Sequence, residues 1–174
     1  MTASFKRHGF TNSVAVGKTK TAGALTSIIP LDLTKDEDQK TVFQWLQHPA
    51  VKGVFLAPPC GTASAARNIE LPGEDAPRPL RSFEEPDGIS GLTVLDLQRA
   101  SAANILYAFC AEVLELCCKL GKLFMSENPR NSLFWLTTAW RETPSAKHLL
   151  FAEHQACGYG GKRPKWTRLA ANFQ

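Results

Sequence analysis

Short apolar runs alternate with longer stretches of helical periodicity along this chain. Each run is bounded by turn-forming or charged residues, and runs of this length and composition predict β-strands. They lie at residues 13–16, 28–31, 51–57 and 123–126, with weaker candidates at 148–155 and 167–170. Because strands that alternate with helices usually pair in parallel and carry the helices on their faces, the pattern predicts an α/β fold with a mostly parallel sheet.

Two segments between the strands have the spacing of helices. The first begins in residues 34–38, which supply an N-cap and an acidic first turn, and ends near residue 48, before Pro49. The second covers residues 92–120 and ends at Gly121. Its apolar residues recur at helical spacing and are expected to face the core: Leu95, Ala102, Ile105, Leu106, Phe109, Val113, Leu116 and Leu120.

Residues 61–91 have a different character, because they are rich in proline, glycine and charge. They predict a long surface loop, and loops of this length in a compact domain usually serve a function or are disordered. The 174 residues of the chain suit a single domain, residues 1–174, that carries this loop.

The net charge, the most apolar stretch and the N-terminus indicate which partners and which cellular location to expect. The net charge is 20 − 16 = +4, which permits an anionic partner but does not require one. The apolar stretch 105–120 is interrupted by charges and is shorter than the roughly 20 residues of a membrane span, so no membrane association is expected. The N-terminus has no apolar signal segment, which predicts an intracellular protein, nuclear in a eukaryote and cytoplasmic otherwise.

The five cysteines favour free thiols, because their number is odd and no two form a CxxC pair. Cys110, Cys117 and Cys118 lie in one predicted helix without the spacing of metal ligands. We expect these three to belong to the core, and we expect no metal site.

Polar residues follow three of the predicted strands. They are Asp32, the Pro58-Pro59-Cys60 turn and the Glu127-Asn128-Pro129 turn. Ligands of parallel α/β sheets bind at the carboxyl ends of the strands. The sequence therefore predicts that a thiol and two carboxylates converge on one edge.

Each of the two turns offers a chemical group and an ordinary structural alternative. Cys60 follows two prolines that restrict the backbone, and a thiolate is a strong nucleophile near neutral pH. Its alternative is a buried structural cysteine. Glu127 can protonate or hydrogen-bond a heterocycle. Its alternative is that it caps the next turn or pairs with an arginine such as Arg130.

A Pro-Cys that ends one strand and a Glu-Asn that ends the next resemble motifs IV and VI of the DNA cytosine-5 methyltransferases. The resemblance implies a Rossmann-like methyltransferase fold and DNA as the partner. It also implies that Cys60 attacks C6 of a flipped-out cytosine and that Glu127 contacts N3. Carbon 5 then takes a methyl group from S-adenosylmethionine.

Further blocks of the chain resemble the same family in the same order. Residues 28–34 resemble its third strand, so the resemblance assigns Asp32 to the adenine of the cofactor and Pro58 to the cofactor site. Residues 157–169 resemble motif VIII, in which Arg163 and Lys165 approach the target base and the DNA backbone. The residues themselves also predict a phosphate-binding strip, with a solvated basic face as the alternative. This strip is Lys162, Arg163, Lys165 and Arg168.

The chain also departs from the family pattern. The first strand and its glycine-rich turn have no counterpart, which predicts that a separate segment supplies them. Gly17 stands where an acidic residue should hold the ribose hydroxyls of the cofactor, and Gly61 stands where the family has glutamine. If the protein is active, the loop 61–91 is expected to close over the DNA. The alternative is a truncated, catalytically inactive methyltransferase remnant that acts as a nucleic-acid or protein binding module.

Overall fold

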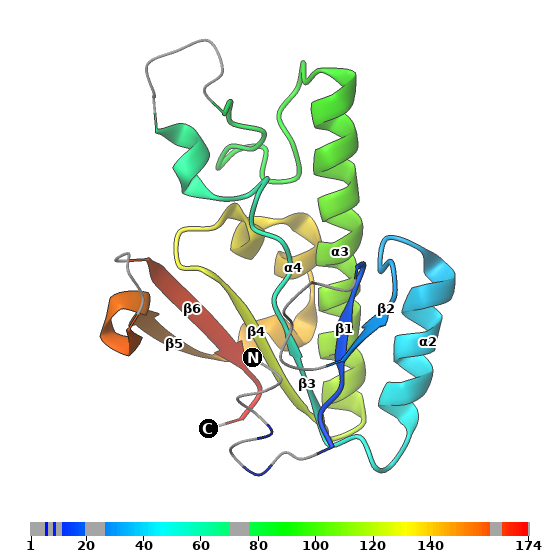
Figure 1. Ribbon diagram of the computed structural model, residues 1–174. Coiled ribbons are helices and arrows are strands. Elements are labelled where there is room, and N and C mark those ends of the chain that lie inside the picture. The colour runs from blue at the N-terminus through cyan, green and yellow to red at the C-terminus, as the bar shows by residue number, and fades with distance from the viewer. Residues whose placement is uncertain are drawn as a thin grey trace. The chain divides into compact units, whose positions relative to one another are not determined.

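The computed structural model describes residues 6, 9, 12–19, 27–69, 77–160 and 165–173 (Figure 1). The chain divides into two compact units, Met1–Val42 and Phe43–Gln174, and the boundary falls within helix α2 (Asp36–Gln47).

The smaller unit contains a short parallel pair of strands. Strand β1 (Ala15–Gly17) pairs with β2 (Ile28–Pro30), as the apolar runs predicted. The chain then turns through Asp32 into α2, whose first turn carries three acidic side chains. Negative charge there is favourable because it lies at the positive end of the helix dipole. The predicted strand–strand–helix order of this segment is confirmed.

The larger unit contains a four-stranded sheet with the order β3-β4-β6-β5. Its strands are β3 (Gly53–Leu56), β4 (Leu123–Pro129), β5 (Leu150–Gln155) and β6 (Trp166–Ala171). Strand β3 pairs with β4 in parallel, whereas β6 is antiparallel to both β4 and β5. Three strands therefore run in one direction, and the last strand is inserted between two of them in the opposite direction (Figure 1).

The prediction of a mostly parallel sheet is not confirmed, because the sheet of the larger unit is mixed. The reason lies in the connection between β5 and β6. Only residues 156–165 join them, including the short helix η4 (Ala156–Tyr159), whereas a parallel crossover needs a dozen or more residues. The architecture is mixed α/β, and a Rossmann-like fold is not confirmed.

Helix α3 (Val94–Lys119) packs against β3 and β4 (Figure 1). Thr93 caps its N-terminus by accepting a hydrogen bond from the Asp96 amide, and Gly121 follows its C-terminal end with a φ of +63°. The helix therefore begins and ends within two residues of the prediction. Its buried residues are Ala100, Ala103, Tyr107, Phe109, Cys110, Ala111, Val113, Leu114 and Cys117.

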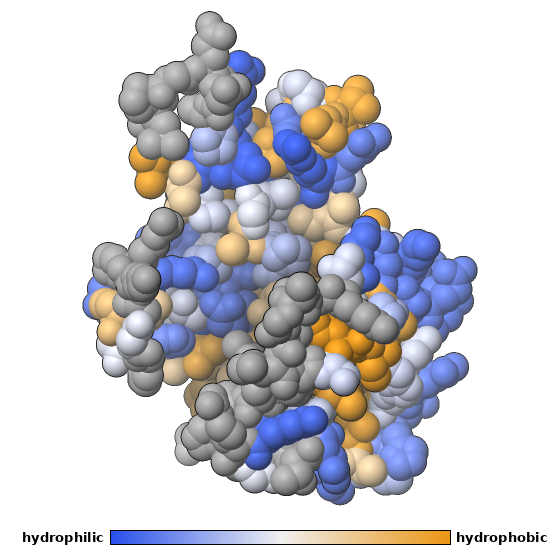
Figure 2. Space-filling model, viewed as in Figure 1, coloured by the Kyte–Doolittle hydropathy of each residue, from blue (hydrophilic) through white to orange (hydrophobic). Residues whose placement is uncertain are grey.

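The face of α3 that turns inward was predicted only in part. Phe109 and Val113 are buried as expected, but Leu95, Ile105 and Leu120 are exposed. Apolar residues occur all round this helix, so their spacing does not select one face. Figure 2 shows exposed apolar atoms at its N-terminal end, where Val94, Leu95 and Leu97 lie.

An aromatic cluster fills the core between α3 and the segment that follows β4. That segment comprises η2 (Leu133–Leu136), α4 (Thr138–Arg141) and η3 (Pro144–His148). Phe134 contacts the rings of Tyr107, Trp135 and Trp140 with centroid distances of 4.8 to 5.0 Å. Such tilted and edge-on contacts add to the free energy gained from burial alone.

Within the described ranges, α3 is the helix that is long and apolar enough to cross a membrane. Nearly half of its most apolar window is buried inside the protein, as in a core helix. A single helix of this kind is a weak indication of a membrane span.

Candidate active site

The two turns predicted to meet at one sheet edge lie on neighbouring parallel strands. Leu56 of β3 is level with Ser126 of β4, so the chain beyond β3 runs beside the last residues of β4. The Asn128 amide nitrogen donates a hydrogen bond of 2.9 Å to the carbonyl of Pro58. Asn128 is only 1% exposed, and its side-chain oxygen has no hydrogen-bond partner among the described residues. The predicted Glu127-Asn128-Pro129 turn is wrong, because these residues pair with β6 and complete β4. Asn128 thus joins the end of β4 directly to the turn that carries Cys60.

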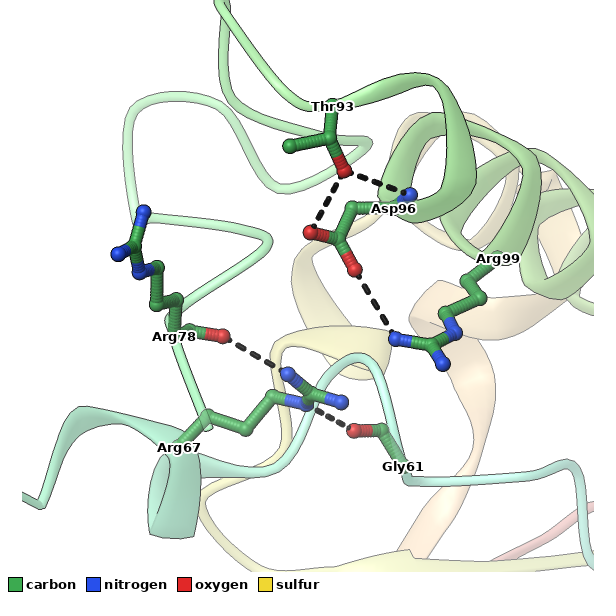
Figure 3. A network of polar contacts seen from close by, with 6 residues as sticks. All are labelled: Gly61, Arg67, Arg78, Thr93, Asp96 and Arg99. Carbon is green, nitrogen blue, oxygen red and sulfur yellow. Dashed lines mark hydrogen bonds and ion pairs between the residues drawn. The ribbon is translucent and has the colours of Figure 1, made fainter. Parts of the chain in front are cut away.

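The turn that carries Cys60 is held by hydrogen bonds on its C-terminal side. Cys60 has a free, half-buried thiol, and its carbonyl accepts a hydrogen bond of 3.0 Å from the Ala63 amide. The guanidinium of Arg67 donates to the carbonyl of Gly61 at 2.5 Å and to the carbonyl of Arg78 at 2.8 Å (Figure 3). These contacts fix the backbone just after the thiol.

Tyr107 of α3 holds the N-terminal side of the same turn. Its hydroxyl donates a hydrogen bond of 2.7 Å to the carbonyl of Pro59 and lies 3.4 Å from the hydroxyl of Thr62. Burial raises the pKa of Tyr107, and the nearby Cys60 raises it further, whereas Thr62 and Arg81 lower it. Tyr107 therefore contacts the turn on both sides of Cys60, at the Pro59 carbonyl and at the Thr62 hydroxyl.

The described part of the predicted loop 61–91 is more ordered and more buried than a surface loop. It contains the short helix η1 (Ala65–Asn68), and Leu80 and Arg81 are 1% and 2% exposed. Arg81 lies over the ring of Tyr107, with its guanidinium carbon 5.2 Å from the ring centroid. Burial lowers the pKa of Arg81. Residues 70–76 of the loop lie outside the described residues.

Glu127 lies at the same edge of the sheet, but its side chain is on the face of β4 opposite to those of Ser126 and Asn128. Residues alternate along a strand, and here Ser126 and Asn128 are buried while the Glu127 side chain is 22% exposed. One of its carboxylate oxygens lies 3.8 Å from the ammonium of Lys165. Glu127 is therefore paired, as its structural alternative predicted, but with Lys165. Arg130 instead pairs with Glu153, at 3.6 Å.

The predicted phosphate-binding strip is only partly described. Lys162 and Arg163 lie outside the described residues. Arg168 of β6 donates two hydrogen bonds to one carboxylate oxygen of Glu153, at 2.9 and 2.7 Å. Since Lys165 is paired with Glu127, both described cations of the strip have a carboxylate partner within the protein.

Asp32 belongs to the smaller unit, at the end of β2. Its carboxylate accepts hydrogen bonds from the amide and the hydroxyl of Thr34, at 3.2 and 2.7 Å, and lies 2.9 Å from the ammonium of Lys18. The hydrogen bonds from Thr34 and Lys18 lower the pKa of Asp32 to about 2. Asp32 is thus a firmly ionised carboxylate whose two oxygens already have donors.

The remaining cysteines differ in their surroundings. Cys110 and Cys117 are buried, and burial raises the pKa of these thiols to about 12 and about 11. Cys118 and Cys157 are exposed, so the prediction that Cys118 belongs to the core is wrong. It lies on the outer side of the last turn of α3. No group of three or more histidine, cysteine, aspartate or glutamate side chains that could hold a metal ion occurs in the part of the chain that the structure describes.

Sequence reasoning missed the residues that hold the Cys60 turn in place. These residues are Thr62 and Arg81 of the predicted loop 61–91 and Tyr107 of α3. Asn128 was noticed only as the neighbour of Glu127. A weak signal was present, because Tyr107 lies one helical turn before Cys110 and Ala111 on the buried side of α3. No signal marks Arg81 within its charged segment. When the chain was compared with protein-family models, curated proteins and solved structures, no match was found.

Proposed function

We propose that this chain is a DNA cytosine-5 methyltransferase-like protein that uses Cys60 as its nucleophile. One observation carries the proposal. Neighbouring parallel strands deliver the Pro-Pro-Cys turn and the Glu127-Asn128 pair to the same edge, where Asn128 bonds to the carbonyl of Pro58. The motif resemblance requires a thiol and an acid at one edge, and this shared edge supports the proposal, with Glu127 on the face of β4 opposite to Asn128.

The residues of this edge suit covalent activation of a pyrimidine. Carbon 5 of cytosine is a poor nucleophile until another group adds to C6. The Cys60 thiolate adds to C6, the electron pair of the C5–C6 double bond moves towards N3, and Glu127 hydrogen-bonds that side of the ring. After C5 has received the methyl group, a water molecule takes its proton, and the Cys60 thiolate leaves C6 as the double bond returns.

S-adenosylmethionine, when bound, supplies the electrophilic methyl group. The resemblance assigns Asp32 and Pro58 to it, and Asp32, taken by itself, fits this role in part. Asp32 is ionised and can accept a hydrogen bond from an amino group, although Thr34 and Lys18 already donate to it. The Lys18 side chain is 71% exposed, so this pairing can yield to a ligand. Gly17 offers no carboxylate to ribose hydroxyls.

A catalytically inactive binding module is the second candidate function. Two observations favour it: Gly17 lacks the expected acidic group, and the described cations of the basic strip are paired within the protein. Such a protein would keep the Cys60 turn as a structural feature and would not form a covalent bond with DNA.

A mechanism-based trap separates the two candidates. A duplex in which 5-fluorocytosine replaces cytosine retains the enzyme as a covalent complex, because fluorine cannot leave C5 as a proton does. We expect the protein to form a denaturation-resistant complex with this duplex when S-adenosylmethionine is present. The complex is detected by its mass, and a digest of it is expected to carry the nucleotide on the peptide that contains Cys60.

The controls use a second free thiol of the same chain. Cys60→Ser should abolish the complex, and Cys118→Ser should leave it unchanged because Cys118 is an exposed cysteine in the last turn of α3, before β4 begins. Failure to form the complex would favour the binding module. A complex that persists in Cys60→Ser would remove Cys60 from the role of nucleophile and assign the covalent bond to another residue.

A further inference from the structure

An arginine is the largest fully buried side chain of the described residues. Arg81 donates to the carbonyls of Pro86 and Ala100, to the side-chain oxygen of Asn104 and to the hydroxyl of Thr62, at 2.7 to 3.2 Å. All four acceptors are neutral. A buried guanidinium is costly to desolvate even when it is hydrogen-bonded, so an apolar side chain would serve packing alone at lower cost.

The hydrogen bonds of Arg81 continue through Thr62 and Tyr107, and only one assignment of donors and acceptors is possible. The Tyr107 hydroxyl must donate to the carbonyl of Pro59, because a carbonyl can only accept. Its single proton is then used, so the Thr62 hydroxyl donates to the Tyr107 oxygen. Thr62 in turn accepts from the Nε of Arg81, at 3.2 Å. The chain runs from the guanidinium through two hydroxyls to a backbone carbonyl, and each bond polarises the next.

Two members of this series of hydrogen bonds, Pro59 and Thr62, lie on either side of the candidate nucleophile in the sequence. Pro59 comes directly before Cys60, and Thr62 comes two residues after it. We propose that Arg81 is a positioning residue for Cys60: acting through Thr62 and Tyr107, it holds the turn 59–62 in the conformation that presents the thiol. The inference rests on the proposed function for the reaction that the thiol performs, but the positioning itself can be tested without that reaction.

Arg81 is itself held in place by further hydrogen bonds, so it can fix the position of the residues that it contacts. Asn104 of α3 accepts from Arg81 and donates to the carbonyl of Asp87, at 2.7 Å in both cases. The Asp87 carboxylate accepts from the amide and the hydroxyl of Thr138, at the start of α4. The segment that carries Arg81 is therefore attached to two helices. A nucleophile held by such a frame avoids the large rate loss that a misplacement of about 1 Å causes.

The test removes single hydroxyls from the chain of hydrogen bonds and follows Cys60 in two ways. The background is the full chain with Cys118→Ser and Cys157→Ser, which leaves Cys60 as the accessible thiol because Cys110 and Cys117 are buried. The first measurement is the rate of Cys60 alkylation by iodoacetamide, from the mass of its peptide. The second is covalent trapping by the 5-fluorocytosine duplex with S-adenosylmethionine.

Thr62→Val and Tyr107→Phe are expected to change the two measurements in opposite directions. Loosening the turn exposes the thiol, so alkylation should become several-fold faster, while trapping should fall by about tenfold or more. Thr62→Ser keeps the hydroxyl and should restore both values. The double variant Thr62→Val/Tyr107→Phe should behave like Tyr107→Phe, because both substitutions interrupt the same series of hydrogen bonds.

Thr143→Val is the matched control for the loss of a buried threonine hydroxyl. Thr143 is buried and donates to the carbonyl of Ala139 at 2.6 Å, outside this chain of bonds. Alkylation of Thr62→Val at the same rate as Thr143→Val would overturn the positioning role, even if trapping showed the proposed function to be right. Faster alkylation in a protein that is never trapped would support the positioning role and contradict the proposed function. Arg81→Lys loses the forked guanidinium and its bond from Nε to Thr62, so it should change alkylation and trapping in the same directions as Thr62→Val.

Discussion

The carboxylate of Asp32, a candidate ligand-binding residue, already has hydrogen-bond and ion-pair partners within the protein. Asp32 receives two hydrogen bonds from Thr34 and the ion pair of Lys18. These partners stabilise the ionised form, which is why the pKa falls to about 2. A ligand that needs Asp32 as an acceptor must therefore compete with donors that the protein itself supplies.

The pKa of Asp32 predicts how the smaller unit responds to acid. The pKa in the folded state lies below the ordinary value, so the stabilisation is fully present above about pH 4 and is lost as the pH falls towards 2. We expect the amide proton of Thr34, followed by NMR, to titrate with a midpoint of about 2. Lys18→Met should move this midpoint upwards. A midpoint near 3.8 in the unaltered protein would contradict the hydrogen-bonded arrangement.

At the same scale, the candidate site was only partly predictable from sequence. Cys60 and Glu127 could be placed at one edge because each follows an apolar run that forms a strand, and the two strands are parallel neighbours. Arg81 and Tyr107 could not be placed, because their meeting with Thr62 depends on how three distant segments pack. The opposite orientation of Glu127 and Asn128 was missed because the sequence predicted a turn there, whereas both residues belong to β4.

At the scale of elements, α3 illustrates why the ends of a helix are easier to predict than its buried face. The ends are marked by local chemistry, Thr93 as the N-cap and Gly121 with its positive φ. The buried face depends on the neighbours that cover it. The short connection after β5 favours an antiparallel pair. The place of β6 between β4 and β5 was unpredictable, because strand spacing does not specify which strand a late segment joins.

Two leucines of α3 provide a matched test of its buried face. Leu114 is fully buried and Leu97 is 56% exposed, and truncation to alanine removes the same atoms from each. We expect Leu114→Ala to lower the free energy of unfolding by about 2–5 kcal/mol, because it leaves a cavity. Leu97→Ala should change it by no more than about 0.5 kcal/mol. Denaturant unfolding followed by circular dichroism measures both, and equal losses would contradict the orientation of α3.

At the scale of the whole molecule, the net charge of +4 does not show which cations are free to bind an anion, because several of them already have carboxylate partners within the protein. On the surface of β5 and β6, Glu153 is the partner of both Arg168 and Arg130, at 2.7 and 3.6 Å. Each arginine also lies over an aromatic ring, Arg130 over Trp166 and Arg168 over Trp135. A polyanion that binds here must therefore displace a carboxylate before it gains the arginines.

Glu153→Gln is expected to release both arginines and to strengthen binding to duplex DNA. The net charge rises from +4 to +5, and the loss of this one carboxylate frees two guanidinium groups from their ion pairs. Each additional phosphate contact should steepen the dependence of log K on log salt by about 0.9, measured by fluorescence anisotropy at several salt concentrations. Glu112→Gln changes the net charge equally, at an exposed position on α3. An equal gain in both variants would assign the effect to net charge, whereas a gain confined to Glu153→Gln would assign it to the paired arginines.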